Sequence, residues 1–258
     1  MRVAVTGATG FIGQHVVREL VSRSGIAVVV STRNTAVNFN ESPRIKVVPM
    51  DLSIENNPYE TLEKPDVLIH LAWGGLPNYK SPHHLEKELP NQYSFLHRMI
   101  QAGLPSILTT GTCYEYGLTN GELHENTIAR PATSYAHAKN SLRLQLESLL
   151  SNQTFNLTWA RLFYMYGEGQ SSSSLFPQLA AAIARGEKSF AMSRGDQLRD
   201  YLPVTQVAKY LVDLALNCPG AGLVNVCSGT PISIRVLVEE YLEKNKIYIA
   251  LDLGKYPY

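Results

Sequence analysis

The first thirteen residues constrain the fold most, because a β-branched run is followed at once by three evenly spaced glycines. Arg2–Val5 predicts a buried parallel strand, and the segment Thr6-Gly7-Ala8-Thr9-Gly10-Phe11-Ile12-Gly13 follows it. Gly7 suits the sharp turn from strand to helix, since a residue without Cβ is needed there. Gly10 lets backbone amides approach an anion at the helix N-terminus, and Gly13 lets the helix lie close to the sheet. In this context the spacing predicts a dinucleotide-binding unit.

Strand-like and helix-like segments alternate along most of the remaining chain. Further β-branched runs predict strands at Ile26–Ser31, Ile45–Pro49, Val67–His70, Ser106–Thr109, Asn156–Ala160 and Leu223–Val226. Apolar residues at helical spacing predict helices at Phe11–Ser22, Gln92–Ala102 and Tyr135–Leu150. This alternation is typical of a parallel sheet covered by helices on both faces, and right-handed crossovers make the sheet doubly wound. We therefore expect an α/β fold of the Rossmann type.

The pattern loosens after Arg161, which indicates a second region. A Gly/Ser-rich segment at 167–174 predicts a loop, and helices are expected at Leu175–Arg185, Val204–Asn217 and Ile234–Lys244. We expect residues 1–161 to form the nucleotide-binding domain with the catalytic residues. Residues 162–258 are expected to form a smaller substrate-binding α/β cap, interleaved with the sheet. Because the apolar ending has no closing helix, we also expect the natural chain to extend past Tyr258 or this segment to be poorly ordered.

Composition and charge exclude several classes of function. The chain has 258 residues with 23 Lys+Arg against 22 Asp+Glu, and this near-neutral balance argues against nucleic-acid binding. No apolar run reaches the about 18–20 residues of a membrane span, and no signal-peptide pattern precedes the first strand. The cysteines Cys113, Cys218 and Cys227 lack the spacing of a disulfide framework or a metal site. We expect a cytoplasmic protein with no membrane or nucleic-acid partner and no metal.

The choice of dinucleotide is predicted from the end of the second strand. An NAD site usually places Asp or Glu there, whereas an NADP site places small polar residues and an Arg that pairs with the 2′-phosphate. Here the strand ends in Ser31, Thr32 and Arg33, which favours NADP. NAD stays possible, because Ser31 tolerates both cofactors and Arg33 can be a solvated loop residue. Asp51-Leu52 follows the third strand, where Asp51 either accepts from the adenine amino group or caps a turn.

A Tyr-x-x-x-Lys pair, Tyr135 and Lys139, is the main candidate for catalysis. On a helix the two side chains share one face, and a nearby ammonium is expected to lower the pKa of the phenol from its usual value of about 10. Tyrosine could then exchange a proton near neutral pH, and Lys139 could also hold the nicotinamide ribose. The hydroxyl-rich segment Thr109–Gly117 follows a strand at the sheet edge where ligands bind.

Taken together, these motifs resemble the extended short-chain dehydrogenases/reductases, the NAD-dependent epimerase/dehydratase family that acts on nucleotide sugars. The resemblance covers most of the chain. It rests on TGATGFIG at 6–13, Asp51-Leu52, Val67–Trp73, Asn91, the hydroxyl segment, the Tyr-x-x-x-Lys pair and Arg199–Val204.

The resemblance implies roles for particular residues. The pyrophosphate would be cradled by Gly7, Gly10, Phe11, Ile12 and Gly13, and the cofactor path lined by Leu71 and Ala72. Thr112 would hydrogen-bond the reacting oxygen, with Tyr135 as the acid/base and Lys139 as its partner. The substrate would contact Trp73, Thr112, Cys113, Tyr114, Tyr164 and Arg199. The resemblance also implies a homodimer through the helices at 92–102 and 135–150.

Departures from the family pattern narrow the expected activity. Cys113 and Tyr114 stand where family dehydratases carry Asp-Glu, which argues against 4,6-dehydration. Tyr164 replaces a common Asn, and the stretch Trp73-Gly74-Gly75-Leu76-Pro77 replaces a commoner Ala-rich stretch, which suggests a reshaped sugar pocket. The chain most resembles dTDP-4-keto-6-deoxyhexose 4-reductases, which implies NADPH-dependent reduction of a 4-keto sugar for polysaccharide biosynthesis. The alternatives are a 4-epimerase with tightly bound NAD(P) and a non-catalytic NADP-binding regulator.

We expect no catalytic role for the histidines outside these motifs. His83 and His84 have no third ligand near them in the sequence, and they are predicted to lie in a solvated loop. His70, on an apolar strand, is expected to be a hydrogen-bonded core residue.

Overall fold

The central element of the fold is a parallel sheet. The computed structural model describes residues 1–33, 39 and 42–257. The strands of the sheet are β1 (Arg2–Thr6), β2 (Ala27–Thr32), β3 (Ile45–Pro49), β4 (Val67–His70), β5 (Ser106–Thr112), β6 (Asn156–Leu162) and β11 (Gly222–Val226). They lie in the order β11-β6-β5-β4-β1-β2-β3, all parallel. The order reverses between β1 and β4, which is where doubly wound sheets bind ligands.

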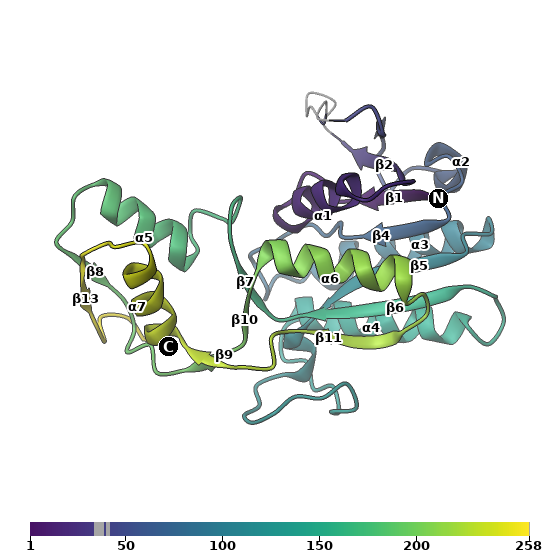
Figure 1. Ribbon diagram of the computed structural model, residues 1–258. Helices are drawn as coiled ribbons and strands as arrows, with labels where there is room; N and C mark the ends of the chain where they lie inside the picture. The colour runs from purple at the N-terminus through teal and green to yellow at the C-terminus, as the bar shows by residue number, and fades with distance from the viewer. Residues whose placement is uncertain (34–38, 40–41, 258) are drawn as a thin grey trace. The chain divides into compact units, whose positions relative to one another are not determined.

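Helices cover both faces of this sheet, as Figure 1 shows. One face carries α1 (Phe11–Ser22) and α6 (Val204–Asn217); the other carries α3 (Leu89–Gln101) and α4 (Ser134–Leu149). Shorter helices are α2 (Pro58–Thr61), a single π-helical turn η1 (His84–Glu88) and a 3-10 turn η2 (Cys113–Tyr116). Arg23 at the end of α1 pairs with Asp213 of α6 at 2.9 Å. The predicted doubly wound α/β fold is confirmed.

Burial on both faces explains the apolar strand sequences. Val3, Ala4 and Val5 of β1 are fully buried, as expected for strands of a sheet covered on two sides. On the α3 and α4 face, one core joins the strands to both helices, and it includes Phe95 and Leu142. The packing of these helices therefore fixes the sheet edge that carries the candidate site.

The chain forms two compact units. The first comprises Met1–Leu162 and Thr205–Val226, and the second Phe163–Val204 and Cys227–Tyr258. Residues 205–226 were predicted in the second region, interleaved with the sheet. They belong to the first unit because β11 pairs with β6, with Val224 opposite Ala160.

The second unit is built from short strands and two helices. Its elements are β7 (Tyr164–Tyr166), α5 (Leu175–Ala184), β8 (Ser189–Ala191), β9 (Leu198–Arg199), β10 (Tyr201–Pro203), β12 (Ile232–Ser233), α7 (Ile234–Lys244) and β13 (Ala250–Asp252). The strands pair two by two, β7 with β10, β8 with β13 and β9 with β12. Phe190 and Met192 pack with Leu179, Val238 and Leu242 in a separate core.

A helix that crosses a bilayer must be both long and apolar. In the ranges that the structure covers, none of the helices combines the length and the apolar character needed to cross a bilayer.

Candidate active site

The glycine turn lies where the strand order reverses, and its glycines meet tight steric demands. Gly7 has φ +72°, and a Cβ there would lie 2.7 Å from the Ala72 nitrogen and 2.8 Å from the Leu71 carbonyl carbon. A Cβ on Gly13 would lie 2.1 Å from the Gly7 oxygen. The turn therefore touches the end of β4, and the first turn of α1 packs directly on it.

The first turn of α1 starts without a side-chain cap. Gly10 is the N-cap residue, so no cap oxygen accepts from the amides of Phe11, Ile12 and Gly13. Such unsatisfied amides, together with the helix dipole, form a site for an anion. This arrangement fits a pyrophosphate at the position that the sequence predicts.

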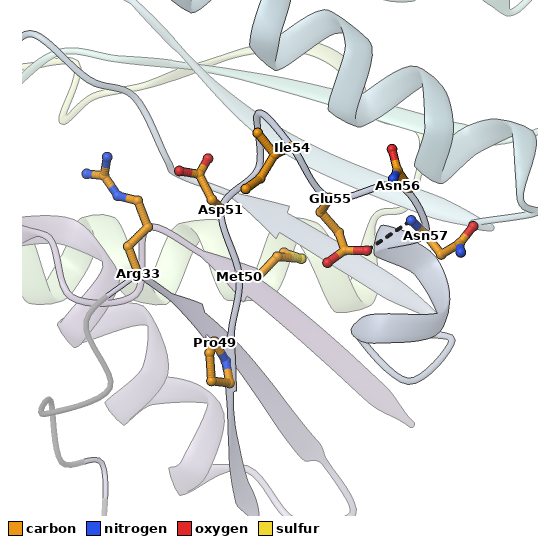
Figure 2. Close-up of a pocket in the computed structure, with 8 residues that line it drawn as sticks. All are labelled: Arg33, Pro49, Met50, Asp51, Ile54, Glu55, Asn56 and Asn57. Atoms are coloured by element: carbon orange, nitrogen blue, oxygen red, sulfur yellow. Dashed lines mark hydrogen bonds between the residues drawn. The ribbon is translucent and has the colours of Figure 1, made fainter.

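A shallow pocket of about 650 Å³ opens beside the ends of β2 and β3 (Figure 2). It is lined by Arg33, Pro49, Met50, Asp51, Ile54, Glu55, Asn56 and Asn57. Asp51 accepts from the Ser53 hydroxyl at 2.7 Å and from the Ser53 amide at 2.9 Å. These hydrogen bonds, and more weakly the charge of Arg33, lower the pKa of Asp51. Asp51 is thus a turn residue that also lines the pocket, while Leu52 packs against the core.

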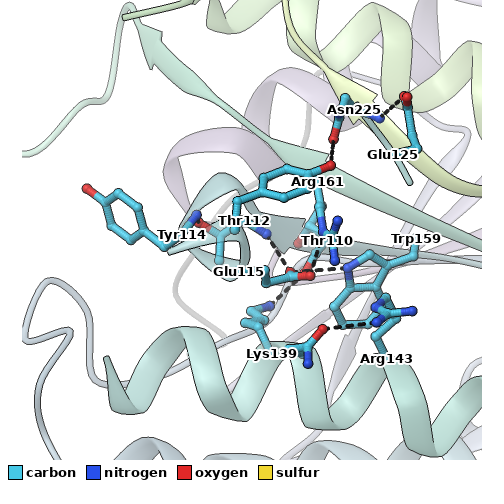
Figure 3. A network of polar contacts seen from close by, with 12 residues as sticks. Thr110, Thr112, Tyr114, Glu115, Glu125, Lys139, Arg143, Trp159, Arg161 and Asn225 are labelled. Atoms are coloured by element: carbon cyan, nitrogen blue, oxygen red, sulfur yellow. Dashed lines mark hydrogen bonds and ion pairs between the residues drawn. The ribbon is translucent and has the colours of Figure 1, made fainter. Parts of the chain in front are cut away.

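A buried carboxylate organises the turn after β5. Glu115 accepts from the Thr112 amide at 2.9 Å, from Trp159 Nε1 at 3.2 Å and from Arg161 Nε at 2.7 Å (Figure 3). The Thr112 hydroxyl in turn accepts from the Tyr114 amide at 3.3 Å, which completes a capping box. The sequence Thr-Cys-Tyr-Glu carries the capping-box signal that could have identified Glu115, which was not predicted as a site residue.

The ion pair between Glu115 and Arg161 is fully enclosed. The side chains are 0% and 1% exposed, and the Arg161 guanidinium lies 4.3 Å from the Tyr116 ring centroid. Tyr116 donates to Asn225 Oδ1 at 2.7 Å. These contacts join η2, β6 and β11, so the position of Thr112 depends on all three.

Tyr135 and Lys139 lie one turn apart on α4, both buried. Thr133 caps this helix and accepts from the Ala136 amide at 3.2 Å. The Lys139 ammonium donates to the Thr110 carbonyl at 2.8 Å and lies 4.0 Å from the Trp73 ring centroid. Burial lowers the pKa of Lys139 to about 7.

The pKa of Tyr135 differs from the sequence-based expectation, which was wrong in direction. Burial raises the pKa of Tyr135 above its ordinary value, and Tyr79, Glu115 and Cys113 raise it further. The ammonium of Lys139 contacts Thr110 and Trp73 and lies 6.0 Å from the Tyr135 ring centroid. The phenol is therefore protonated at neutral pH.

Aromatic rings from the segment after β4 surround Tyr135. Ring centroids of Trp73, Tyr79 and His84 lie 5.9, 5.5 and 5.3 Å from that of Tyr135. Tyr114 contacts Tyr79 at 5.3 Å. Tyr79 also accepts from the Tyr135 amide through its carbonyl at 3.0 Å. The segment therefore fixes both the start of α4 and the surroundings of the phenol.

His84 was predicted in a solvated loop, and this prediction was wrong. The residue is 0% exposed, because it is the first residue of η1 and packs between Trp73 and Tyr135. Only long-range packing buries it. Its neighbour His83 contacts Glu88 at 3.1 Å.

Two further polar groups close this side of the site. Glu88 accepts from the Gly74 amide at 2.9 Å and from Gln92 at 2.9 Å, and these bonds lower its pKa against the effect of burial. His70 shares a hydrogen bond of 2.7 Å with the Thr6 hydroxyl, and burial lowers its pKa to about 3.

Within the described ranges no three His, Cys, Asp or Glu side chains could hold a metal ion together.

Two of the predicted substrate residues lie in the second unit. The Arg199 guanidinium is 5.4 Å from the Tyr164 ring centroid and donates to the Leu198 carbonyl at 2.7 Å. Tyr164 also contacts Tyr201, whose pKa is raised by burial. Trp73, Thr112, Cys113 and Tyr114 belong to the first unit with the Tyr-x-x-x-Lys pair.

A doubly wound sheet with a glycine turn at the reversal of strand order, and a buried Tyr-x-x-x-Lys pair, defines an NAD(P)-dependent oxidoreductase of the short-chain type. The model of the NAD dependent epimerase/dehydratase family matches residues 3–227. The chain therefore belongs to this family of extended short-chain dehydrogenases/reductases, as predicted.

Similar proteins include enzymes of nucleotide-sugar metabolism. The chain is 26% identical to "dTDP-6-deoxy-L-talose 4-dehydrogenase (NAD(+))" of Aggregatibacter actinomycetemcomitans, over 100% of this chain and 95% of that protein. It is 27% identical to "GDP-6-deoxy-D-mannose reductase" of Pseudomonas aeruginosa, over 92% of this chain and 78% of that protein. A UDP-N-acetylglucosamine 4-epimerase from Methanobrevibacter ruminantium matches in structure with TM-score 0.85 and 23% identity, over 98% and 86% of the two chains.

Proposed function

We propose that the chain is an NADPH-dependent reductase of the 4-keto group of a nucleotide-activated 6-deoxy sugar, dTDP-linked, which makes a deoxyhexose donor for polysaccharide biosynthesis. The observation that carries this proposal is the geometry of the site: the buried side chains of Tyr135 and Lys139 lie one turn apart on α4, and Thr112 caps the turn after β5. Two relatives support the substrate class, since their names specify oxidation or reduction of 6-deoxy nucleotide sugars.

The glycine turn and the pocket beside β2 are proposed to hold the cofactor. The unsatisfied amides of Phe11, Ile12 and Gly13 would donate hydrogen bonds to the pyrophosphate. The turn that presents these amides requires glycine, because a Cβ on Gly7 or Gly13 would clash with neighbouring backbone atoms. The adenosine end would occupy the pocket of Arg33 and Asp51, next to Leu52 in the chain, and the path from there would run by Leu71 and Ala72 beside Gly7.

Arg33 is proposed to select NADPH by pairing with the 2′-phosphate. Arg33→Asp should weaken NADPH binding and improve NADH binding, because a carboxylate accepts from a free 2′-hydroxyl and repels a phosphate. Binding titrations with both cofactors measure the change, with Arg44→Asp, at the residue before β3, as a control for charge reversal. A relative named for NAD(+) makes this test necessary, and equal loss for both cofactors would refute the role of Arg33.

The proposed chemistry uses three side chains of the first unit. When bound, reduced nicotinamide supplies a hydride to the carbonyl carbon. Tyr135 donates its phenolic proton to the carbonyl oxygen as negative charge develops there. Thr112 donates a hydrogen bond to the same oxygen, since its hydroxyl accepts from the Tyr114 amide and keeps its own proton available. Lys139, which is partly protonated near neutral pH, can return a proton to Tyr135 after the step.

The raised pKa of Tyr135 favours reduction of the 4-keto group over oxidation of the 4-hydroxyl at neutral pH. Oxidation of the 4-hydroxyl needs the phenolate as a base, whereas reduction needs the phenol. Because burial raises the pKa of Tyr135, we expect oxidation to become faster as pH rises and reduction to dominate near pH 7.

The second candidate is a 4-epimerase with tightly bound NAD(P), because the family to which the chain belongs includes epimerases. An assay of NADPH oxidation over a series of 4-keto-6-deoxy nucleotide sugars, with dTDP, GDP, UDP and CDP carriers, decides between the two. A reductase consumes one NADPH per sugar, whereas an epimerase consumes none and interconverts 4-hydroxyl epimers. Cofactor binding without either reaction would favour a non-catalytic NADP-binding regulator.

A further inference from the structure

The ammonium of Lys139 rests on an aromatic ring. Lys139 is 3% exposed, and its Nζ lies 4.0 Å from the Trp73 ring centroid while it donates to the Thr110 carbonyl. Cation–π attraction strengthens when both groups are desolvated. The Trp73 ring therefore stabilises the charged form of Lys139, which burial destabilises.

The Trp73 ring is held in its orientation by His84. The indole Nε1 donates to His84 Nδ1 at 3.1 Å, and His84 Nε2 lies 2.9 Å from the Asn78 carbonyl. An indole nitrogen only donates and a carbonyl only accepts, so His84 is neutral with its proton on Nε2. Both ring nitrogens of His84 are thus engaged, and the imidazole is fixed by groups on two sides.

The same two rings also contact the other member of the catalytic pair. Trp73 meets the Tyr135 ring edge-on, with centroids 5.9 Å apart, and His84 lies 5.3 Å away. We propose that Trp73 and His84, here called the indole clamp, are positioning residues. The face of the Trp73 ring holds the Lys139 ammonium near Tyr135 and the proposed site of the nicotinamide ribose, and His84 fixes the orientation of that ring. The importance of the clamp for turnover rests on the proposed function, but its contact with Lys139 can be tested without activity.

A spectroscopic test uses the two tryptophans of the chain. Trp159→Phe leaves Trp73 as the sole tryptophan, which can be excited selectively at wavelengths where tyrosine does not absorb. Its fluorescence should change as pH falls through about 7, where Lys139 gains its proton, and Lys139→Met should abolish this transition. His84→Gln should keep the transition, because the titrating group is Lys139. Persistence of the transition in Lys139→Met, or its absence in the Trp159→Phe parent, would overturn the proposal.

The titration of Lys139 must be distinguished from that of other groups that act on Lys139 or face the clamp. Glu115 of η2 and Glu88 of η1 raise the pKa of Lys139, while His70 of β4 carries a pKa of about 3. Tyr135 titrates far above neutrality, and His84→Gln removes the remaining imidazole of the clamp. Should Trp159→Phe fail to fold, ¹⁵N-indole spectra of the natural sequence resolve the Trp73 signal, which should shift in His84→Gln and titrate near pH 7.

A functional test compares two replacements of Trp73. Trp73→Phe keeps a ring face for the ammonium, whereas Trp73→Leu keeps an apolar side chain, slightly smaller than Phe, and removes the ring face. Trp73→Leu should weaken NADPH binding and lower kcat by about tenfold relative to Trp73→Phe. Tyr210→Leu, at a 40% exposed aromatic residue of α6, is the matched control and should change neither.

The outcomes separate the two proposals. Equal losses in Trp73→Leu and Trp73→Phe would show that the ring face does not hold Lys139. Absence of NADPH oxidation in the unsubstituted chain would instead refute the proposed function, while the fluorescence transition would still report the contact between Trp73 and Lys139.

Discussion

Burial acts on the two members of the catalytic pair in opposite directions. It raises the pKa of the Tyr135 phenol and lowers the pKa of the Lys139 ammonium to about 7. Both effects favour the neutral form of the side chain. Near neutral pH, Tyr135 is thus protonated and can act as an acid. Lys139 gains or loses its proton in the same pH range, in which the reaction is proposed to run.

This state of the pair predicts an order of losses among single variants. Tyr135→Phe should keep NADPH binding, since the ring still packs against Trp73 and His84. It should lower kcat by about 10²–10⁴-fold, because general acid catalysis is lost. Thr112→Val should cost less, because it removes a hydrogen bond and leaves the proton source. Lys139→Met should lower kcat and weaken cofactor binding.

Steady-state kinetics and cofactor titrations at pH 7 measure these effects. Near-normal kcat in Tyr135→Phe at saturating NADPH and substrate would contradict the reductase mechanism. It would then point to another acid or to a binding protein.

His70 makes a separate prediction about acid stability. Its folded pKa of about 3 lies below the unfolded value of about 6.5. Between these values the unfolded chain binds a proton that the folded chain does not, so stability falls as pH decreases. From pH 7 to pH 5 this one residue should cost about 2 kcal/mol.

Urea unfolding of the unsubstituted chain and of His70→Asn at both pH values measures this contribution. Asn can keep a hydrogen bond to Thr6 but does not titrate, so the variant should lose about 2 kcal/mol less between pH 7 and pH 5. Equal losses in the two chains would show that His70 is not buried in its neutral form.

Among the elements, the start of α1 is the most sterically restricted part of the proposed cofactor site. Gly13→Ala would place Cβ 2.1 Å from the Gly7 oxygen, so the helix must move and we expect a loss of about 3 kcal/mol or more. Gly10→Ala is the matched control, because its Cβ would lie 3.2 Å from the same oxygen. It should cost about 1 kcal/mol as a poorer N-cap. Thermal or urea unfolding compares the two, and similar losses would contradict the close packing of α1.

The sheet and its helices were predictable because their signals are local. Apolar periodicity marked α1, α6 and α7 at their observed bounds, and β-branched runs marked all seven strands of the sheet. β5 and β6 extend further than expected, because Thr110, Gly111 and Thr112 pair with Ala160, Arg161 and Leu162. Gly111 and Arg161 interrupt the β-branched pattern, so the ends of these two strands carry only a weak local signal.

The features that the sequence did not predict depend on contacts between residues that are distant in the sequence. His84 lies in a polar stretch, and it is buried only because Trp73 and Tyr135 pack on it. The role of Glu115 as an acceptor for Trp159 and Arg161 spans more than forty residues of sequence. The pairs of short strands in the second unit have two or three residues each, which is too short for periodicity to reveal.

For the whole molecule, we propose a homodimer through the outer faces of α3 and α4. Leu144 of α4 is 51% exposed, two residues from the buried Leu142 and so on the opposite side of the helix. Leu144→Glu should convert the dimer into a monomer in size-exclusion chromatography with light scattering. Tyr210→Glu, on α6 at the other face of the sheet, should leave the dimer intact. A monomeric unsubstituted chain would refute the proposal.

The pairing of β11 with β6 has a consequence for synthesis of the chain. β6 is complete at Leu162, but its partner strand ends at Val226, and the residues between them include a large part of the second unit. At about 5–20 residues per second, β6 remains an open edge on the ribosome for several seconds. An apolar unpaired edge is a template for association with other strands. Nascent chains that pause between these positions would be the ones most in need of a chaperone.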